Sequence, residues 1–130
     1  MKRSKKITAL CIAIAMLFAV MPTVQAEAVE ARMTYIISYA ADLSISSSGE
    51  ASITGYVRGK SGVTSTYVCA TLQKQSGNDW IDVESWEDSS TNRNLSIVET
   101  YSVSRGTYRV VVTVTANTET KTTVSVTRTY

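Results

Sequence analysis

The sequence predicts an all-β protein preceded by a short N-terminal leader. Three observations carry this prediction. Val, Ile, Thr and Tyr dominate residues 33–130, and these residue types favour the pleated, half-buried surface of a sheet. Apolar and polar residues alternate with a period of two through seven segments. Turn-forming residues separate these segments at intervals of about 8–12 residues, which is typical of sandwiches and barrels.

The first 26 residues have the three parts of a secretory signal peptide. Residues 7–20 form an uncharged apolar run, Pro22 ends it, and Val24 and Ala26 place small residues at the positions that a signal peptidase inspects. The positive charges before the apolar run are Lys2, Arg3, Lys5 and Lys6. We therefore expect a signal-peptide helix that is cleaved after Ala26.

Two alternatives for this leader are a membrane anchor and a lipoprotein signal. The apolar run covers about 14 residues, fewer than the roughly 18–20 that a spanning helix needs. Cys11 lies inside the run, whereas a lipid-modified cysteine would close it. A cleaved leader is the favoured interpretation, with no membrane attachment afterwards.

Cleavage changes what the composition means. Removing 26 of the 130 residues leaves 104, enough for one domain. Four of the thirteen basic residues leave with the leader, so nine face eleven acidic residues and the net charge becomes −2. No basic patch suited to a phosphate backbone remains, and we expect no nucleic-acid partner.

Cys69 is the one cysteine that follows the leader. It alternates with Val68, Ala70 and Leu72, so we expect it to point away from the core as a half-buried strand residue. An intermolecular disulfide and a reactive thiol are the alternatives.

The first three strands are expected at residues 34–45, 51–58 and 65–74. Residues 46–49 and 59–62 provide turns that contain Gly and Ser. In the second strand one face is expected to carry Ala51, Ile53, Gly55 and Val57.

The last four strands are expected at residues 80–86, 95–103, 107–116 and 121–130. Gly77-Asn78 indicates a hairpin before the fourth strand. Residues 88–93, 104–106 and 117–119 supply a polar loop, a corner and a turn. The sixth strand is the most apolar and should be central, and Val124 and Val126 are expected to point inward from the last.

Seven such strands predict an antiparallel sandwich of immunoglobulin or fibronectin III type over residues 33–130, after a flexible lead-in at 27–32. Tyr108 follows Gly106 at the start of the sixth strand. This is where such sandwiches place a corner tyrosine, whose ring enters the core while its hydroxyl binds the loop backbone.

Three motifs resemble a family of small secreted proteins. They are Leu72-Gln73-Lys74, then Trp80, Val83 and Trp86, then Tyr-Ser-Val-Ser-Arg-Gly-Thr-Tyr-Arg-Val at 101–110. Over residues 33–130 the chain resembles a family from Gram-positive, clostridial-type bacteria with a signal peptide, one short Ig-like β domain and no known function. The resemblance implies export and fold but no catalytic residue, and Cys69 departs from the pattern.

The chemistry of the side chains disfavours an enzyme. The chain has no histidine, which removes imidazole bases, Ser-His and Cys-His nucleophiles and histidine metal sites. We therefore predict no catalytic residues, no cofactor and no metal. Clustered carboxylates keep a calcium loop and a glycosidase pair open as alternatives, although the chain is short for a deep cleft and lacks an ordered calcium-loop pattern. These carboxylates are Asp79, Asp82, Glu84, Glu87 and Asp88.

The densest candidate site is the predicted fourth strand. Trp80, Asp82, Glu84 and Trp86 share one parity, and Ile81 and Val83 share the other. If the aliphatic pair enters the core, two tryptophans with two carboxylates between them form an outward ligand surface suited to stacking sugars. A solvated edge strand, whose charges block edge-to-edge pairing, is the alternative.

We therefore expect a secreted, extracellular and monomeric β-sandwich module that is not an enzyme. Its role is binding or structural, and its partner is a cell-wall glycan or an extracellular protein. The alternative function is a small secreted effector of bacteriocin-like type.

Overall fold

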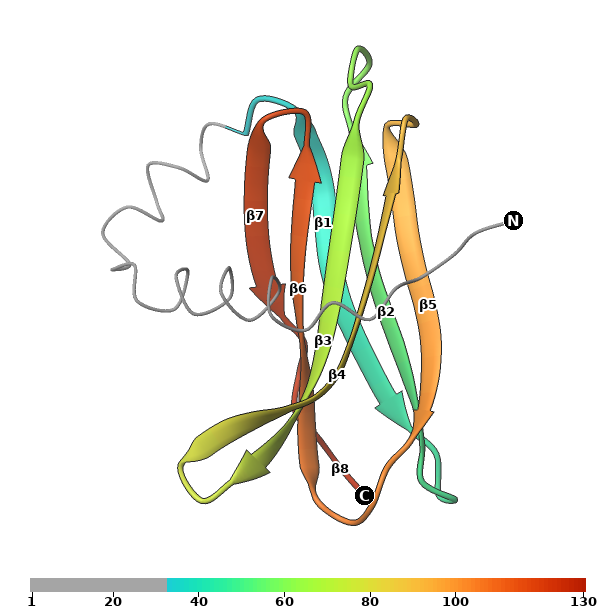
Figure 1. Ribbon diagram of the computed structural model, residues 1–130, viewed down its shortest axis with the longest axis vertical. Coiled ribbons are helices and arrows are strands. Elements are labelled where there is room, and N and C mark those ends of the chain that lie inside the picture. Colours follow the sequence, from blue (N-terminus) through green and yellow to red (C-terminus); the bar gives the residue numbers. More distant parts are fainter. Residues whose placement is uncertain (1–32) are drawn as a thin grey trace.

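The computed structural model describes residues 33–130, which form two antiparallel sheets packed face to face (Figure 1). The strands are β1 (Ile36–Ile45), β2 (Glu50–Gly59), β3 (Thr66–Ser76), β4 (Asp79–Ser90), β5 (Asn94–Ser102), β6 (Thr107–Ala116), β7 (Glu119–Val124) and β8 (Arg128–Thr129). The predicted signal-peptide helix at 1–26 and the lead-in at 27–32 lie outside the described residues. Residues 33–130 include no helix long and apolar enough to cross a membrane.

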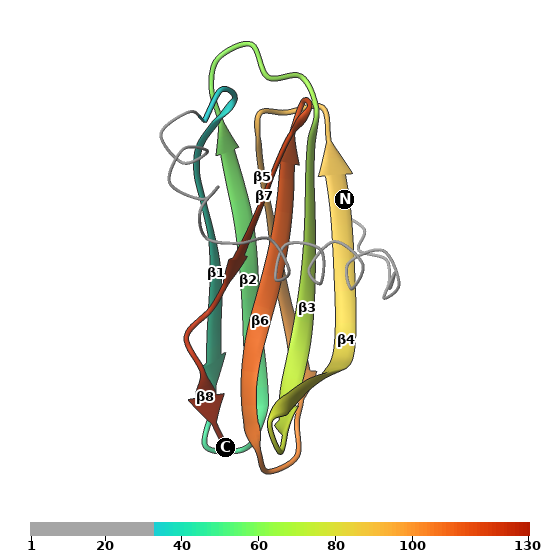
Figure 2. The same cartoon turned by 90° about the vertical axis from the view of Figure 1, so that its left-hand side faces the viewer.

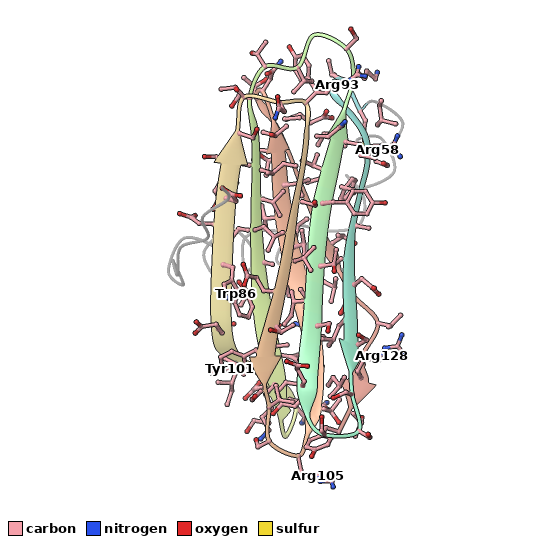
Figure 3. All side chains as sticks on the ribbon, turned by 90° about the vertical axis from the view of Figure 1, so that its right-hand side faces the viewer. Arg58, Trp86, Arg93, Tyr101, Arg105 and Arg128 are labelled. Carbon is pink, nitrogen blue, oxygen red and sulfur yellow. The ribbon has the colours of Figure 1, made fainter. Side chains whose placement is uncertain are left out.

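Three strands form one sheet in the order β1-β2-β5. The other sheet has five strands. Four of them follow the order β4-β3-β6-β7, and the fifth, β8, pairs with β6 at Thr107 and Tyr108. Figure 2 looks onto the five-stranded sheet, and Figure 3 looks from the opposite side onto the three-stranded sheet. As its apolar sequence predicts, β6 is an interior strand.

The core lies between the sheets and follows the predicted alternation. The inward side chains of β2 include Ala51, Ile53 and Val57, all 0% exposed. A Cβ built on Gly55 would lie 2.9 Å from Val112 Cγ2, so glycine permits the sheets to approach closely at this point. The largest fully buried side chains are Tyr108, Ile36, Leu43, Ile53, Leu72, Ile97, Val57, Val68, Val110, Val112, Val114 and Thr66.

Two predicted turn features are confirmed. Gly77-Asn78 connects β3 and β4 as a two-residue hairpin loop, with a positive φ of 63° at Gly77. Tyr108 is 2% exposed, and its hydroxyl donates to the backbone oxygen of Ser104 at 2.9 Å. The ring therefore packs in the core while the hydroxyl ties the β5–β6 corner to β6.

A carboxylate closes the open side of the sandwich between β1 and β7. Glu119 accepts hydrogen bonds from the backbone N–H groups of Thr34, Tyr35 and Ile36 at 2.7–3.1 Å. Burial alone would raise the pKa of Glu119, but these three donors and the nearby Lys121 outweigh it and lower the pKa. The start of β1 is thus attached to the opposite sheet through a charged group.

The prediction for the last strand is wrong in two respects. Strand β7 ends at Val124, where Ser125 exchanges hydrogen bonds with Val110 before the chain leaves the ladder. Val124 and Val126 are 45% and 59% exposed and do not point inward. The inward position opposite Val114 is occupied instead by Lys121. Strand β7 is an edge strand, and Lys121 lies near the Glu119 carboxylate.

The predicted polar loop at 88–93 is shorter than expected. Strand β4 continues to Ser90, which pairs with Thr66. The Thr66 hydroxyl then donates to the backbone oxygen of Asn92 at 2.8 Å. These pairings extend the ladder through residues whose side chains are typical of loops.

Candidate ligand-binding surface

The candidate residues lie on β4, an edge strand that pairs with β3 through a hairpin. The hairpin curves away from the rest of the five-stranded sheet at its tip (Figure 1). The register shifts between Leu72 and Gln73, because Leu72 pairs with Glu84 whereas Gln73 pairs with Asp82. Val83 is the extra residue of this β-bulge, and the alternation of side chains is interrupted there.

The bulge separates the two tryptophans. Trp86 pairs with Ala70 on the core side and is 7% exposed. Its ring meets Tyr101 edge-on, with centroids 6.0 Å apart and an interplanar angle of 72°, between β4 and β5 (Figure 3). Trp86 is therefore a packing residue, and the four candidate residues of β4 do not share one outward face.

Of the two aliphatic residues of β4 that were expected to enter the core, only Ile81 differs from the expectation. Ile81 is 54% exposed and lies near the start of β4, close to the hairpin loop at Gly77-Asn78. Val83 is partly buried and packs against the core. Glu84 pairs with Leu72 and is half-buried on the Trp86 side of the bulge, so it does not join Asp82.

Trp80 belongs to a network that crosses three strands on the outer face. The Arg109 guanidinium lies over the Trp80 ring, 4.3 Å from its centroid. Arg109 Nε donates to Gln73 Oε1 at 2.8 Å, and Gln73 Nε2 donates to Asp82 Oδ1 at 2.9 Å. The Gln73 amide thus joins the cation to the carboxylate, and each group restricts the rotamers of its neighbours.

This arrangement gives a preorganised aromatic and acidic surface. Partial burial lowers the pKa of Arg109, but a guanidinium remains charged at neutral pH. One face of the Trp80 indole is taken by Arg109, and the side chain is half-exposed. Such a surface offers an aromatic ring, a hydrogen-bond acceptor at Asp82 and little freedom to lose on binding.

Gln73 and Arg109 are site residues that the sequence analysis missed. Each occupies an outward position of a predicted strand, and this is the only signal that the sequence carries for them. Their meeting depends on β3 being paired with β6 and on Arg109 standing beside Gln73 in that register. Strand order is a long-range property that alternation does not reveal.

The carboxylates of β4 are distributed among separate partners. Glu87 Oε1 accepts from the Tyr67 hydroxyl at 2.6 Å, while Asp82 binds Gln73. Burial, the hydrogen bond from Tyr67 and the Glu87 charge together raise the pKa of Tyr67. No group of three or more acidic or cysteine side chains suited to a metal ion occurs within residues 33–130.

Cys69 points to the outer face of the five-stranded sheet, opposite Glu87 and Thr113, as predicted. It is 1% exposed, and therefore fully buried rather than half-buried. Hydroxyl pairs across the same face, Thr71 with Ser85 at 2.8 Å and Thr113 with Thr122 at 3.2 Å, satisfy neighbouring polar groups.

Comparisons with known proteins assign no family to this chain. No protein-family model matches it, and no curated protein does. The family resemblance described from the sequence therefore stays a prediction, and functional inference depends on the fold and on the surface around Trp80.

Proposed function

We propose that residues 33–130 form an immunoglobulin-like sandwich of the fibronectin III variety. Strand order supports this proposal. In immunoglobulin constant domains the fourth strand pairs within the sheet of the first, second and fifth strands. Here β4 pairs with β3 in the other sheet. The hydrogen bond from Tyr108 to Ser104 is the corner contact of such sandwiches.

We propose that the protein is a secreted, non-catalytic module that binds a cell-wall glycan outside the cell. Export is inferred from the leader at 1–26. The observation that carries the binding proposal is the Trp80 ring held in place beside Asp82 by Arg109 and Gln73. The apolar face of a sugar ring stacks on an indole, and sugar hydroxyls donate to a carboxylate.

The supported surface is smaller than the predicted one. It keeps Trp80 and Asp82, adds Arg109 and Gln73 as the residues that position them, and leaves out Trp86. Glu84 and Trp86 affect binding only through the stability of β4.

Tryptophan fluorescence of the secreted protein tests this function. The chain contains two tryptophans, so a Trp86→Phe variant leaves Trp80 as the sole reporter. Titration with purified cell-wall polysaccharide from the producing species should shift or quench its emission. A Trp80→Ala variant, which lacks this reporter and is compared with the wild type by calorimetry, should bind about tenfold more weakly, which corresponds to roughly 1.4 kcal/mol.

An Ile81→Ser variant is the matched control, because it changes an exposed apolar residue next to Trp80 without touching the network. It should retain binding. Equal affinities of the wild-type and Trp80→Ala proteins would contradict the proposed surface, and an absence of binding to every wall polysaccharide would contradict the proposed function. Mass spectrometry of the secreted protein should find Glu27 at the N-terminus.

A further inference from the structure

The outer face of the three-stranded sheet, which faces the viewer in Figure 3, carries a shallow depression, whereas Trp80 belongs to the five-stranded sheet. The strands β2 and β5 form its floor. Its lining residues are Thr54, Tyr56, Val57, Arg58, Asn94, Leu95, Ser96 and Val98. Val57 and Leu95 point into the core, so the surface chemistry comes from the other six.

Two arginines lie at the same end of the three-stranded sheet, Arg58 in the lining of this depression and Arg93 in the β4–β5 loop next to it (Figure 3). Arg58 pairs with Asn94, and the backbone oxygen of the preceding Arg93 accepts from Gly59 N at 2.7 Å. Both side chains are exposed. Neither guanidinium has a hydrogen bond, an ion pair or a ring contact with another residue of the described chain.

The other basic side chains within residues 33–130 are engaged in the fold. Arg128 donates to the Leu43 backbone oxygen, and Arg105 lies over the Tyr130 ring at 4.2 Å. The remaining four are Lys60, bound to the Met33 backbone oxygen, Lys74, bound to Ser104, Arg109, bound to Gln73, and Lys121, which is buried. Arg58 and Arg93 therefore differ from these six, because their guanidinium groups remain available to bind a ligand.

The depression has no acidic lining residue. The nearest carboxylate along the ladder is Asp42, which pairs with Thr54 at the other end. Arg58 and Thr54 are four residues apart on one strand, or roughly 13 Å. The charge of this surface is thus positive at the Arg58 end, which complements an anion.

The neighbouring groups indicate what kind of anion fits. Tyr56 lies two residues from Arg58 on the same outer face, about 7 Å along the strand. Tyr56 provides a ring for stacking, and the Asn94 amide provides donors and an acceptor for hydroxyl groups. A guanidinium binds a carboxylate through two parallel hydrogen bonds. An acidic sugar presents all of these partners within a short distance.

We propose that this face binds an acidic polysaccharide, with carboxylates on Arg58 and Arg93 and a sugar ring on Tyr56. This site is distinct from the surface at Trp80 and goes beyond the function proposed for it. The two sites lie on opposite sheets, so one domain contacts two polysaccharides at once.

Binding of the secreted protein to polygalacturonate, measured by calorimetry at low salt, tests the proposal. The double variant R58Q/R93Q should lose at least about tenfold in affinity, because two charge-assisted contacts disappear. An R105Q variant removes one positive charge at the other end of the molecule and is the control for a general effect of charge (Figure 3). It should remain within about twofold of the wild type. Thermal unfolding should show that all three proteins are folded.

Additional binding measurements distinguish an acidic sugar from other sources of negative charge. Tyr56→Ala should weaken binding to polygalacturonate, whereas Trp80→Ala should not, which keeps this test independent of the function proposed above. Neutral dextran should not compete. The proposal is overturned by a lack of polygalacturonate binding, by equal losses in R105Q and R58Q/R93Q, or by polyphosphate or single-stranded DNA binding as tightly as the polyuronate.

Discussion

The two halves of β4 have similar sequences and opposite roles. Residues 79–82 hold Trp80 on the outer face under Arg109, and residues 84–90 hold Trp86 in the core against Tyr101. The tryptophans are six positions apart, an even spacing that predicts a common face, but the bulge at Val83 reverses the parity. One extra residue in a strand thus converts a predicted pair of binding residues into one surface residue and one core residue.

The largest expected difference between the halves is in stability. Trp86→Ala should lower the free energy of unfolding by about 3–5 kcal/mol, because it leaves a large cavity between β4 and β5. Trp80→Ala should cost less than about 1 kcal/mol, since it removes mainly a cation–π contact. Chemical denaturation followed by circular dichroism measures both. Equal costs would contradict the assignment of the two rings to different environments.

Deleting Val83 is a direct test of the bulge. The residues on either side already occupy alternate positions opposite Leu72 and Gln73, so the deletion should give a regular ladder with Trp80 and Trp86 still on opposite faces. The expected cost is about 1–2 kcal/mol for the lost apolar contact of a partly buried valine. Emission from Trp80, recorded with Trp86→Phe in the background, should be unchanged. A shift toward the emission of a buried indole would show that the register had moved.

Gln73→Ala should disrupt the network around Trp80 while the protein stays folded. The substitution removes the link between Arg109 and Asp82 and should cost about 0.5–1.5 kcal/mol of stability. Arg109 would be less restricted over Trp80, so the fluorescence anisotropy of Trp80 should fall. Lys74→Ala at the next residue changes the contact with Ser104 instead, and should leave Trp80 unaffected.

The smallest expected effect is a dependence of stability on pH, which arises where β3 contacts the part of β4 that follows the bulge. Tyr67 donates to Glu87, and its pKa in the folded protein lies above the ordinary value of 10.0. The folded state therefore holds this proton more tightly than the unfolded state, so the stabilisation is complete below pH 10 and decreases as the pH rises above it. Tyr67→Phe should flatten this part of the stability profile. An unchanged alkaline slope in the variant would assign the loss to other groups.

Local features could be predicted from the sequence because their causes are local. The hairpin at Gly77-Asn78 follows from turn chemistry, and the buried face of β2 follows from alternation in Ala51, Ile53 and Val57. Tyr108 could be placed at a corner because its hydrogen-bond partner, Ser104, is four residues away. The sequence indicates Trp80 as a candidate but also places Trp86 on the same face, because a bulge leaves no clear mark in a polar edge strand.

The amino-acid sequence by itself determined the β-rich character, the approximate strands and most of the core, since these depend on side-chain type and on a period of two. Only the tertiary structure decided which residues meet across strands: Arg109 with Trp80, Glu119 with the start of β1, and Arg58 beside Arg93. Those contacts depend on strand order and register, and one unpaired residue is enough to change the face on which a side chain lies. The physical reason is that pairing is chosen by the free energy of the whole packed sandwich rather than by any single segment.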